Sequence, residues 1–353
     1  MFFVGSDIAG RGGRETVLPQ VVEGFLSRGH VVSMVLLGHA ADRRWEDRLP
    51  HLRVGPVQPG PNIIKWNFIM IASWLRKTIG EFRPDVVIAV DPEAAFLVRM
   101  TMIRPPRLVS WLHGDYSPYR HSFGLTFCQA HLAVSHALAE RARKDFHKPA
   151  LAVGNPVDLA VPVLRRPTMG DAARFLYIGR LDGNKRVDRI LEALGHVRLP
   201  WRLQVVGDGP EREHLEALAA TLGIRDRVDW HGWCEDPWLE VAEVTALLFT
   251  SHAEGFPMVL LEAAARGVPI MAMDCPTGPR EIVTPENGWL LAESDDLTEM
   301  STLLTELSLG SCVLPSAAQV RATAARYSLD AVLTRMEEGL ALARQGEQHA
   351  GYF

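Results

Sequence analysis

Short runs of consecutive apolar residues alternate along the chain with longer stretches in which apolar residues recur at helical spacing. Continuous apolar runs, such as 31–37 and 84–91, are typical of strands that are buried on both faces. Stretches such as 15–29 and 137–146 repeat their apolar residues every three or four positions, which predicts helices. Strand and helix alternate in this way twice over, so the pattern predicts two α/β domains with parallel sheets.

The break between the two series falls in a stretch that is rich in Pro and Arg and has no periodicity. We therefore expect an N-terminal domain over 1–160, a linker over 161–173 and a second domain over 174–325. The last helical pattern predicts a C-terminal helix over 326–345. A length of 353 residues suits two domains better than one core.

Charge is unevenly distributed between the two halves. Residues 1–160 hold 19 Lys and Arg against 14 Asp and Glu, a net +5, whereas residues 161–353 hold 18 against 28, a net -10. Different partners for the two halves and chance explain this uneven charge equally well. The total of -5 gives no reason to expect a nucleic-acid partner. The four cysteines match no zinc-site spacing and are expected to be free thiols in a reducing cytosol.

Targeting signals are not evident in the sequence. The start, "MFFVGSDIAGRGG", has no basic region and too short an apolar run for a signal peptide, and no apolar run reaches the ~18 residues of a membrane span. We therefore expect a cytoplasmic protein. Segment 62–82 mixes Trp and Ile with Lys65, Arg76 and Lys77. It is either a helix lying on the cytoplasmic face of an anionic inner membrane or a core helix, and the second interpretation is favoured for most of it.

Candidate chemistry in the first half lies where strands are expected to end. Gly12 and Gly13 come after the first strand and open a helix, and glycine lets backbone amides approach an anion. A simple tight turn is the alternative. His113 follows an apolar strand and is a candidate acid, base or hydroxyl-binding group, with a structural histidine as the alternative.

Two cations follow one strand of the second half. Arg180 ends the strand and Lys185 comes five residues later, just before a helix. A guanidinium and an ammonium at one strand end are suited to neutralising a diphosphate. For a single Arg, a solvated loop charge would be the better interpretation.

The stretch "EGFPMVLLE" places two carboxylates on either side of a helix start. Pro257 suits the first helical position, so the free backbone donors begin at Met258 and Val259. Glu254, outside the helix, would face a hydroxyl-rich group, whereas Glu262 would hold a diol such as that of a ribose. Two unrelated surface glutamates are the alternative, but that does not explain the apolar neighbours of Glu262.

Together these stretches resemble the family-four retaining glycosyltransferases, over nearly the whole chain. Glu254 and Glu262 look like that family's E-x7-E motif, and "GRGGRETVL", "SWLHG", "GNPVD" and "YIGRLDGNKRVDRILEAL" are similar to its other motifs. "WHGW", "DPW" and "DCPTGPREI" are most similar to the bacterial lipopolysaccharide core galactosyltransferases. The resemblance implies a GT-B fold, an α/β fold with two Rossmann-like domains facing across a cleft, and a C-terminal helix that crosses back to the first domain.

The resemblance also implies roles for the candidate residues. In the second domain these are Arg180, Lys185, Glu254, Met258, Val259 and Glu262. The two cations and the two helix-start amides would hold the donor diphosphate, Glu262 the ribose and Glu254 the transferred sugar. From the first domain, His113 would face the donor sugar and the acceptor. Gly12 and Gly13 would bring backbone close to the diphosphate and the acceptor.

The implied activity is retaining transfer of a hexose, above all galactose from UDP-galactose, to a lipopolysaccharide core or related envelope glycan or glycolipid. The chain has no D-x-D triplet, and no metal or other cofactor is expected because the cations and the helix end can neutralise the diphosphate. The alternatives are a UDP-glucose or UDP-N-acetylglucosamine donor with another acceptor, a GT-B-fold nucleotide-sugar epimerase, and a non-catalytic nucleotide-binding module. The complete set of cations and glutamates argues against the last.

Overall fold

The structure is a computed structural model that describes residues 1–6, 12–38, 40, 45–46, 49, 52–57, 63–102, 106–119, 121–168 and 170–350. The chain forms two compact units, the first made of Met1–Pro156 and Leu329–Phe353 and the second of Val157–Ser328. The segment expected to be a linker, 161–173, therefore lies within the second unit. There the backbone of Arg165 forms a parallel bridge with Glu243.

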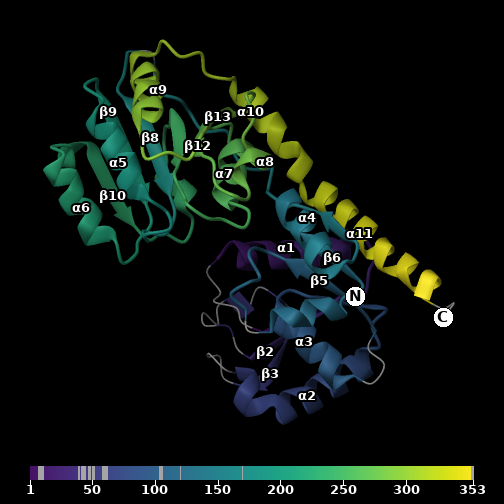
Figure 1. The fold of residues 1–353 in the computed structure, drawn as a ribbon. Coiled ribbons are helices and arrows are strands. Elements are labelled where there is room, and N and C mark those ends of the chain that lie inside the picture. Colours follow the sequence, from purple (N-terminus) through teal and green to yellow (C-terminus); the bar gives the residue numbers. More distant parts are fainter. Residues whose placement is uncertain are drawn as a thin grey trace. The chain divides into compact units, whose positions relative to one another are not determined.

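The first unit holds, over its described residues, a seven-stranded parallel sheet in the order β3-β2-β1-β4-β5-β6-β7 (Figure 1). The strands are β1 (Phe2–Gly5), β2 (Ser33–Gly38), β3 (Leu52–Val57), β4 (Val86–Ala89), β5 (Arg107–Leu112), β6 (Ala130–Ala133) and β7 (Ala150–Ala152). The helices are α1 (Gly13–Ser27), α2 (Ile63–Phe82), α3 (Pro92–Thr101), α4 (His136–Phe146) and the C-terminal α11 (Leu329–Ala350).

The second unit holds a six-stranded parallel sheet in the order β10-β9-β8-β11-β12-β13, again over its described residues. The strands are β8 (Ala173–Ile178), β9 (Trp201–Val206), β10 (Val228–Gly232), β11 (Ala246–Phe249), β12 (Ile270–Met273) and β13 (Gly288–Leu291). The helices are α5 (Val187–Gly195), α6 (Arg212–Thr221), α7 (Met258–Ala265), α8 (Pro279–Ile282), α9 (Thr298–Leu309) and α10 (Ala317–Ala324). The predicted parallel α/β architecture of both halves is confirmed.

Local sequence signals explain where several helices begin. Asp91 caps α3 by accepting a hydrogen bond from the amide of Ala94 at 2.8 Å, and Pro92 takes the first helical position, where its missing N–H costs nothing. Ser135 caps α4 by accepting from the amide of Leu138 at 3.2 Å. Both caps come directly after buried strands, so each strand passes into its helix within a few residues.

The C-terminal helix α11 packs on the first unit, against α1 and β6 (Figure 1). Arg28 and His30, which follow α1, both reach Glu337 of α11, at 2.7 Å and 2.9 Å. The helix was expected to start at residue 326. It starts at Leu329 because a short helical turn ends at Tyr327 and the next residue, Ser328, has a ψ of 152°, which is not helical.

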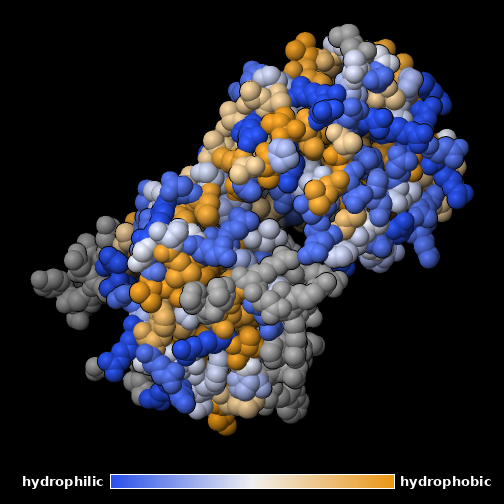
Figure 2. Space-filling view, turned by 180° about the vertical axis from the view of Figure 1, so that it is seen from behind, coloured by the Kyte–Doolittle hydropathy of each residue, from blue (hydrophilic) through white to orange (hydrophobic). Residues whose placement is uncertain are grey.

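Helix α2 was predicted to be either a core helix or a membrane-surface helix. Ile71, Leu75 and Ile79 are fully or almost fully buried, so one face packs in the core. Ile69 and Met70, on another face, are 83% and 45% exposed. Residue 62 and the side chains before Phe68 lie outside the described residues. No helix of the described chain is long and apolar enough to cross a membrane. Figure 2 shows small hydrophobic patches among hydrophilic side chains on the face that it draws.

Candidate active site

The order of the second sheet reverses between β8 and β11, which are paired in parallel. Strands that follow one another in the chain lie outward from this point in both directions. Such switch points are where parallel sheets bind ligands, at the carboxyl ends of the strands. The loop after β8 carries Arg180 and Lys185, and the loop after β11 carries Glu254, so three of the predicted residues come from the two strands that flank the switch point.

Lys185 and Glu254 form an ion pair across the switch point. The Nζ atom of Lys185 donates to Oε1 of Glu254 at 2.6 Å. The side chains are only 25% and 14% exposed, so the pair is shielded from solvent on most sides. The residues are 69 positions apart in the chain and meet because their strands are neighbours. Each charge is thus neutralised by the other.

Polar side chains tie these two loops together. The side-chain amide of Asn184 donates to the carbonyl of Ala253 at 2.9 Å and accepts from the amide of the same residue at 3.1 Å. The hydroxyl of Thr250, at the end of β11, lies 3.0 Å from the carbonyl of Lys185. The hydroxyl of Thr277 donates to the carbonyl of Glu254. The backbone of the ion pair is therefore held from three directions.

Arg180 lies in a different environment from Lys185. Its side chain is 69% exposed and its Nε lies 3.3 Å from a carboxylate oxygen of Asp182. Its carbonyl accepts a hydrogen bond from the hydroxyl of Tyr177 at 2.8 Å. Burial raises the pKa of Tyr177 far above its usual value, and the nearby carboxylates of Asp182 and Glu254 add to this, so the phenol stays a donor. After β8, the structure thus places one shielded cation, Lys185, and one exposed cation on a long side chain, Arg180.

Gly207, at the end of β9, allows the neighbouring strands to end in close contact. A Cβ atom on this residue would lie 1.8 Å from the carbonyl oxygen of Gly179, and its φ of +144° is one that other residues rarely adopt. Its amide donates to the carbonyl of Gly232 at 2.7 Å. The backbones of Gly207, Gly179 and Gly232 therefore approach one another closely beside the loop of Arg180.

Helix α7 starts at Met258, with Pro257 as the residue before the helix rather than its first member. Pro257 has φ -73° and ψ 101°, which is extended backbone. The amides of Met258 and Val259 are in the first turn and have no partner within the helix. The predicted free donors are thus where the sequence placed them, and the positive end of the helix dipole follows directly after Glu254 and its loop.

Glu262 lies one turn further along α7 and has a neutral partner. Its Oε2 accepts a hydrogen bond from the indole N–H of Trp238 at 2.8 Å. Burial raises the pKa of Glu262, while the Trp238 hydrogen bond and the charge of Arg266 partly offset this. The carboxyl group is therefore well shielded, unlike that of a surface glutamate. The alternative of two unrelated surface glutamates is wrong for both members of the motif.

His113 and the two glycines belong to the first unit. Both ring nitrogens of His113 are buried and neither has a hydrogen-bond partner among the described residues. Burial lowers the pKa of His113 well below its usual value, and the charge of Arg14 adds to this, so the ring is neutral at pH 7. Gly12 precedes α1 and Gly13 is its first residue. Residues 7–11 of the predicted glycine-rich loop lie outside the described residues.

Comparison with known proteins places these features in a family. The model of the family described as "Glycosyltransferase Family 4" matches residues 11–161, and that of "Glycosyl transferases group 1" matches residues 166–324. A lipopolysaccharide 1,6-galactosyltransferase of Escherichia coli K12 is 30% identical over 329 residues, which is 87% of this chain and 89% of the relative. The chain belongs to the family 4 glycosyltransferases. The enzyme of the same name from Salmonella typhimurium is 32% identical over 80% of this chain and 82% of its own length.

Solved structures agree with this assignment of the glycosyltransferase. The lipopolysaccharide outer core galactosyltransferase WaaB, in its apo form, superposes with a TM-score of 0.83 at 28% identity, covering 96% of this chain and 98% of its own. Anabaena HepE in complex with UDP superposes with a TM-score of 0.76 at 20% identity, covering 97% and 100%, and at that identity it shows the fold alone. The predicted GT-B fold class, with two Rossmann-like units, is confirmed.

Sequence reasoning on the glycosyltransferase missed the residues that position the predicted ones. These are Tyr177, Asn184, Trp238, Thr250 and Thr277. Only Trp238 had a readable signal, because the order Asp-Pro-Trp is typical of a capped helical turn. No group of three or more His, Cys, Asp or Glu in the described chain is arranged to hold a metal. Whether activity is independent of metal stays a prediction.

Proposed function

We propose that this glycosyltransferase moves galactose from UDP-galactose to an acceptor of the lipopolysaccharide core, with retention of the anomeric configuration. The observation that carries the donor site is the Lys185–Glu254 pair at the switch point of the second sheet, beside the start of α7. The choice of galactose and of the acceptor class is supported by two relatives that are both named lipopolysaccharide 1,6-galactosyltransferase. Retention rests on the family resemblance.

The second unit supplies charge where the donor needs it. We assign Lys185, Arg180 and the first amides of α7 to the donor diphosphate. As the sugar–phosphate bond breaks, negative charge grows on the leaving diphosphate, and fixed cations and amides stabilise that charge without first having to reorganise. Arg180 is exposed and has a long side chain, so it can turn toward a phosphate that Lys185 holds from the shielded side.

The two glutamates take the neutral, hydroxyl-bearing parts of the donor. We assign Glu262 to the ribose diol and Glu254 to the hydroxyls of the transferred sugar. In the first unit, the two nitrogens of the neutral His113 ring have no hydrogen-bond partner among the described residues, and one is a donor and the other an acceptor, which suits a sugar hydroxyl. Its role toward donor sugar and acceptor, and the roles of Gly12 and Gly13, remain predictions from the resemblance.

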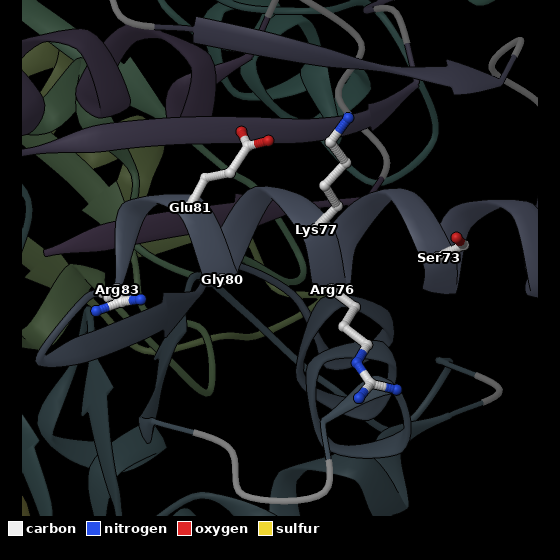
Figure 3. A pocket seen from close by; sticks show the side chains of 6 residues that line it. All are labelled: Ser73, Arg76, Lys77, Gly80, Glu81 and Arg83. Atoms are coloured by element: carbon white, nitrogen blue, oxygen red, sulfur yellow. The ribbon is translucent and has the colours of Figure 1, made fainter.

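A membrane contact is proposed for the exposed face of α2. Arg76, Lys77 and Arg83 line a shallow hollow there together with Ser73, Gly80 and one acidic residue, Glu81. Figure 3 shows Lys77 and Glu81 on one side of the helix and Arg76 on the other. This hollow is formed by α2 and by Arg83, the residue that follows it, so we do not take it for the catalytic site. Exposed cations beside apolar Ile69 and Met70 complement an anionic lipid surface.

The membrane proposal is tested by sedimentation with vesicles. The protein is expected to bind vesicles with anionic lipid at low salt and to lose most of that binding when Arg76 and Lys77 are both replaced by Glu. A control that reverses Arg202 and Arg225, in the second unit, is expected to bind as well as the unchanged protein. Equal binding by the α2 variant would refute the proposal.

The donor is tested by thermal unfolding in the presence of single nucleotide sugars. A ligand that binds only the folded state raises the unfolding temperature. UDP-galactose is expected to protect more than UDP-glucose or UDP-N-acetylglucosamine, and a guanine nucleotide sugar is not expected to protect. Protection by a guanine nucleotide sugar alone would overturn the UDP assignment. Turnover of a UDP-sugar without any acceptor would favour the epimerase instead.

The roles of the two glutamates are separated by kinetics. Glu262→Ala is expected to weaken donor binding, because the diol loses its acceptor, and to appear as a raised donor KM. Glu254→Ala is expected mainly to lower kcat, because the sugar is no longer oriented for transfer. An identical loss of nucleotide affinity in both variants, with no other effect, would contradict this division.

A further inference from the structure

The indole of Trp238 reaches Glu262 from a short helical turn that the sequence builds for it. The turn, η4 (Pro237–Glu240), begins after Asp236, whose carboxylate accepts a hydrogen bond from the backbone amide of Trp238 at 3.1 Å. Trp238 itself is buried, with 7% exposure, so its ring cannot leave without exposing a large apolar surface. The donor atom is thus fixed in place before any ligand arrives.

Arg266 holds the other side of this arrangement. Its guanidinium carbon lies 4.5 Å from the centre of the Trp238 ring, a cation–π contact, and its Nη1 donates to the backbone carbonyl of Glu262 at 3.2 Å. The nearby cation therefore stacks on the indole and bonds the backbone, and the structure records no ion pair within 4.0 Å between Arg266 and the Glu262 carboxylate. The carboxylate takes its hydrogen bond from a neutral group instead.

The indole N–H of Trp238 binds one of the two carboxylate oxygens of Glu262 and leaves the other available. An arginine would occupy both oxygens with its two parallel N–H groups, whereas the indole has one N–H and binds Oε2 only. Among the described residues, none donates a hydrogen bond to Oε1 of Glu262. Two vicinal hydroxyls need at least one free carboxylate oxygen in a fixed orientation, and this geometry provides it.

We propose that Trp238 is a positioning residue for the donor: it fixes one oxygen of Glu262 and leaves the other for the ribose hydroxyls of the nucleotide. This rests on the proposed function, in which Glu262 binds the ribose. Trp238 does not touch the reacting atoms. It sets the rotamer of the carboxylate, and its hydrogen bond lowers the pKa of Glu262 against the larger rise that burial causes, since a hydrogen bond to the charged form favours that form.

The chain offers a matched control for this idea. Trp201, in the same unit, also donates its indole N–H, to the carbonyl of Val197 at 3.2 Å, and also carries an arginine, Arg227, 5.2 Å from its ring centre. Its acceptor is a backbone carbonyl remote in sequence from the E-x7-E stretch. Trp201→Phe and Trp238→Phe therefore remove the same N–H group and keep an aromatic ring under an arginine.

The test measures the affinity for UDP by calorimetry across a pH series. Trp238→Phe is expected to raise the Kd for UDP about tenfold or more, which is the scale of a lost hydrogen bond to a charged group. It is also expected to move the pH at which affinity falls on acidification to a higher value, because Glu262 then protonates more easily. Trp201→Phe is expected to change neither quantity. Glu262→Gln is expected to weaken UDP binding and to remove this pH dependence.

The outcomes separate the two ideas. If Glu262→Gln weakens UDP binding but Trp238→Phe leaves both Kd and pH profile unchanged, the positioning role is wrong and the ribose role of Glu262 stands. If Glu262→Gln binds UDP normally, the ribose role fails and the positioning role fails with it. Should Trp238→Phe not fold, the indole N–H signal of Trp238 in the unchanged protein, measured by NMR, decides the question: it is expected to shift with the titration of Glu262, and an unresponsive signal would refute the proposal.

Discussion

The ion pair between Lys185 and Glu254 predicts an effect of unusual sign. The ammonium that we assign to the diphosphate is bound by the carboxylate of Glu254 at 2.6 Å. An incoming diphosphate must take the place of that carboxylate and must also lie close to its negative charge. Glu254→Gln removes the charge and keeps the shape of the side chain. We therefore expect Glu254→Gln to bind UDP more tightly than the unchanged protein, while transferring sugar more slowly.

The size of the effect follows from the geometry. Two unit charges 2.6 Å apart attract by about 6 kcal/mol at an effective dielectric constant of about 20, a gross figure. Most of this gross energy is offset, because the diphosphate itself attracts the ammonium of Lys185 once the carboxylate is displaced. Water also hydrates an ammonium that has lost its carboxylate partner. With side chains 25% and 14% exposed, solvent screens the remainder further. A net gain of about 1 kcal/mol, or about fivefold in Kd, is the expectation.

The assay is calorimetric titration with UDP, which has the diphosphate but no sugar for Glu254 to contact. Glu243→Gln is the matched control, since it removes one carboxylate from the same unit, where Glu243 pairs with Arg174 at 3.5 Å and does not reach Lys185. The gain in the Glu254 variant is expected to shrink as salt rises, because salt screens the repulsion that it relieves. UDP binding that is unchanged or weaker in Glu254→Gln would refute the reasoning.

Three further predictions concern stability and metal. Burial lowers the pKa of His131 to about 4, so between pH 6.5 and 4 the unfolded chain binds a proton that the folded chain does not. The free energy of unfolding is therefore expected to fall by about 3 kcal/mol as the pH is lowered over this range. Urea titrations measure this fall, which is expected to be smaller for His131→Asn. Gly207→Ala is expected to lose about 2 kcal/mol or more in the same titrations, because its Cβ would overlap a carbonyl oxygen, whereas Gly183→Ala, with nothing within 4 Å, is expected to lose little. Activity is expected to survive EDTA; abolition by EDTA with rescue by magnesium or manganese would show that the Arg180–Lys185 assignment is insufficient.

The sequence predicted best those elements whose local pattern matches their final environment. The strand β11 has the sequence "ALLF" and is buried on both faces, so its continuous apolar run correctly predicted a buried strand. The strand β3 was missed because Gly55 and Pro56 interrupt its pattern. Gly55 is needed there for a tertiary reason, since a Cβ atom would lie 2.3 Å from the carbonyl oxygen of Leu37 on the adjacent strand. Close approach between strands cannot be read from one segment alone.

The candidate site shows the same division. Glu254, Met258, Val259 and Glu262 share one helix start, so their spacing was informative from the sequence. The partners of the two glutamates were not, because Lys185 and Trp238 lie 69 and 24 positions away and are brought in by the sheet order and by η4. The sequence could name the cation and the carboxylates, but it assigned all of them to the ligand and did not anticipate that two of them bind each other.

The partners that the structure gives these glutamates differ in a way that fits their proposed tasks. Glu254 is held by Lys185, the cation that we assign to the diphosphate, so on that assignment its partner must change when the donor arrives. Glu262 is held by a neutral, buried indole that no part of the donor can replace, so its partner stays. A carboxylate that reads an invariant ribose needs a fixed orientation. If Glu254 faces the transferred sugar, its carboxylate is released from Lys185 when a diphosphate binds that lysine. The sugar hydroxyls then meet a free hydrogen-bond acceptor only when the whole donor is bound. The same motif thus combines a rigid contact and an exchangeable one, and the opposite signs expected for Glu262→Gln and Glu254→Gln in UDP binding distinguish them in one titration.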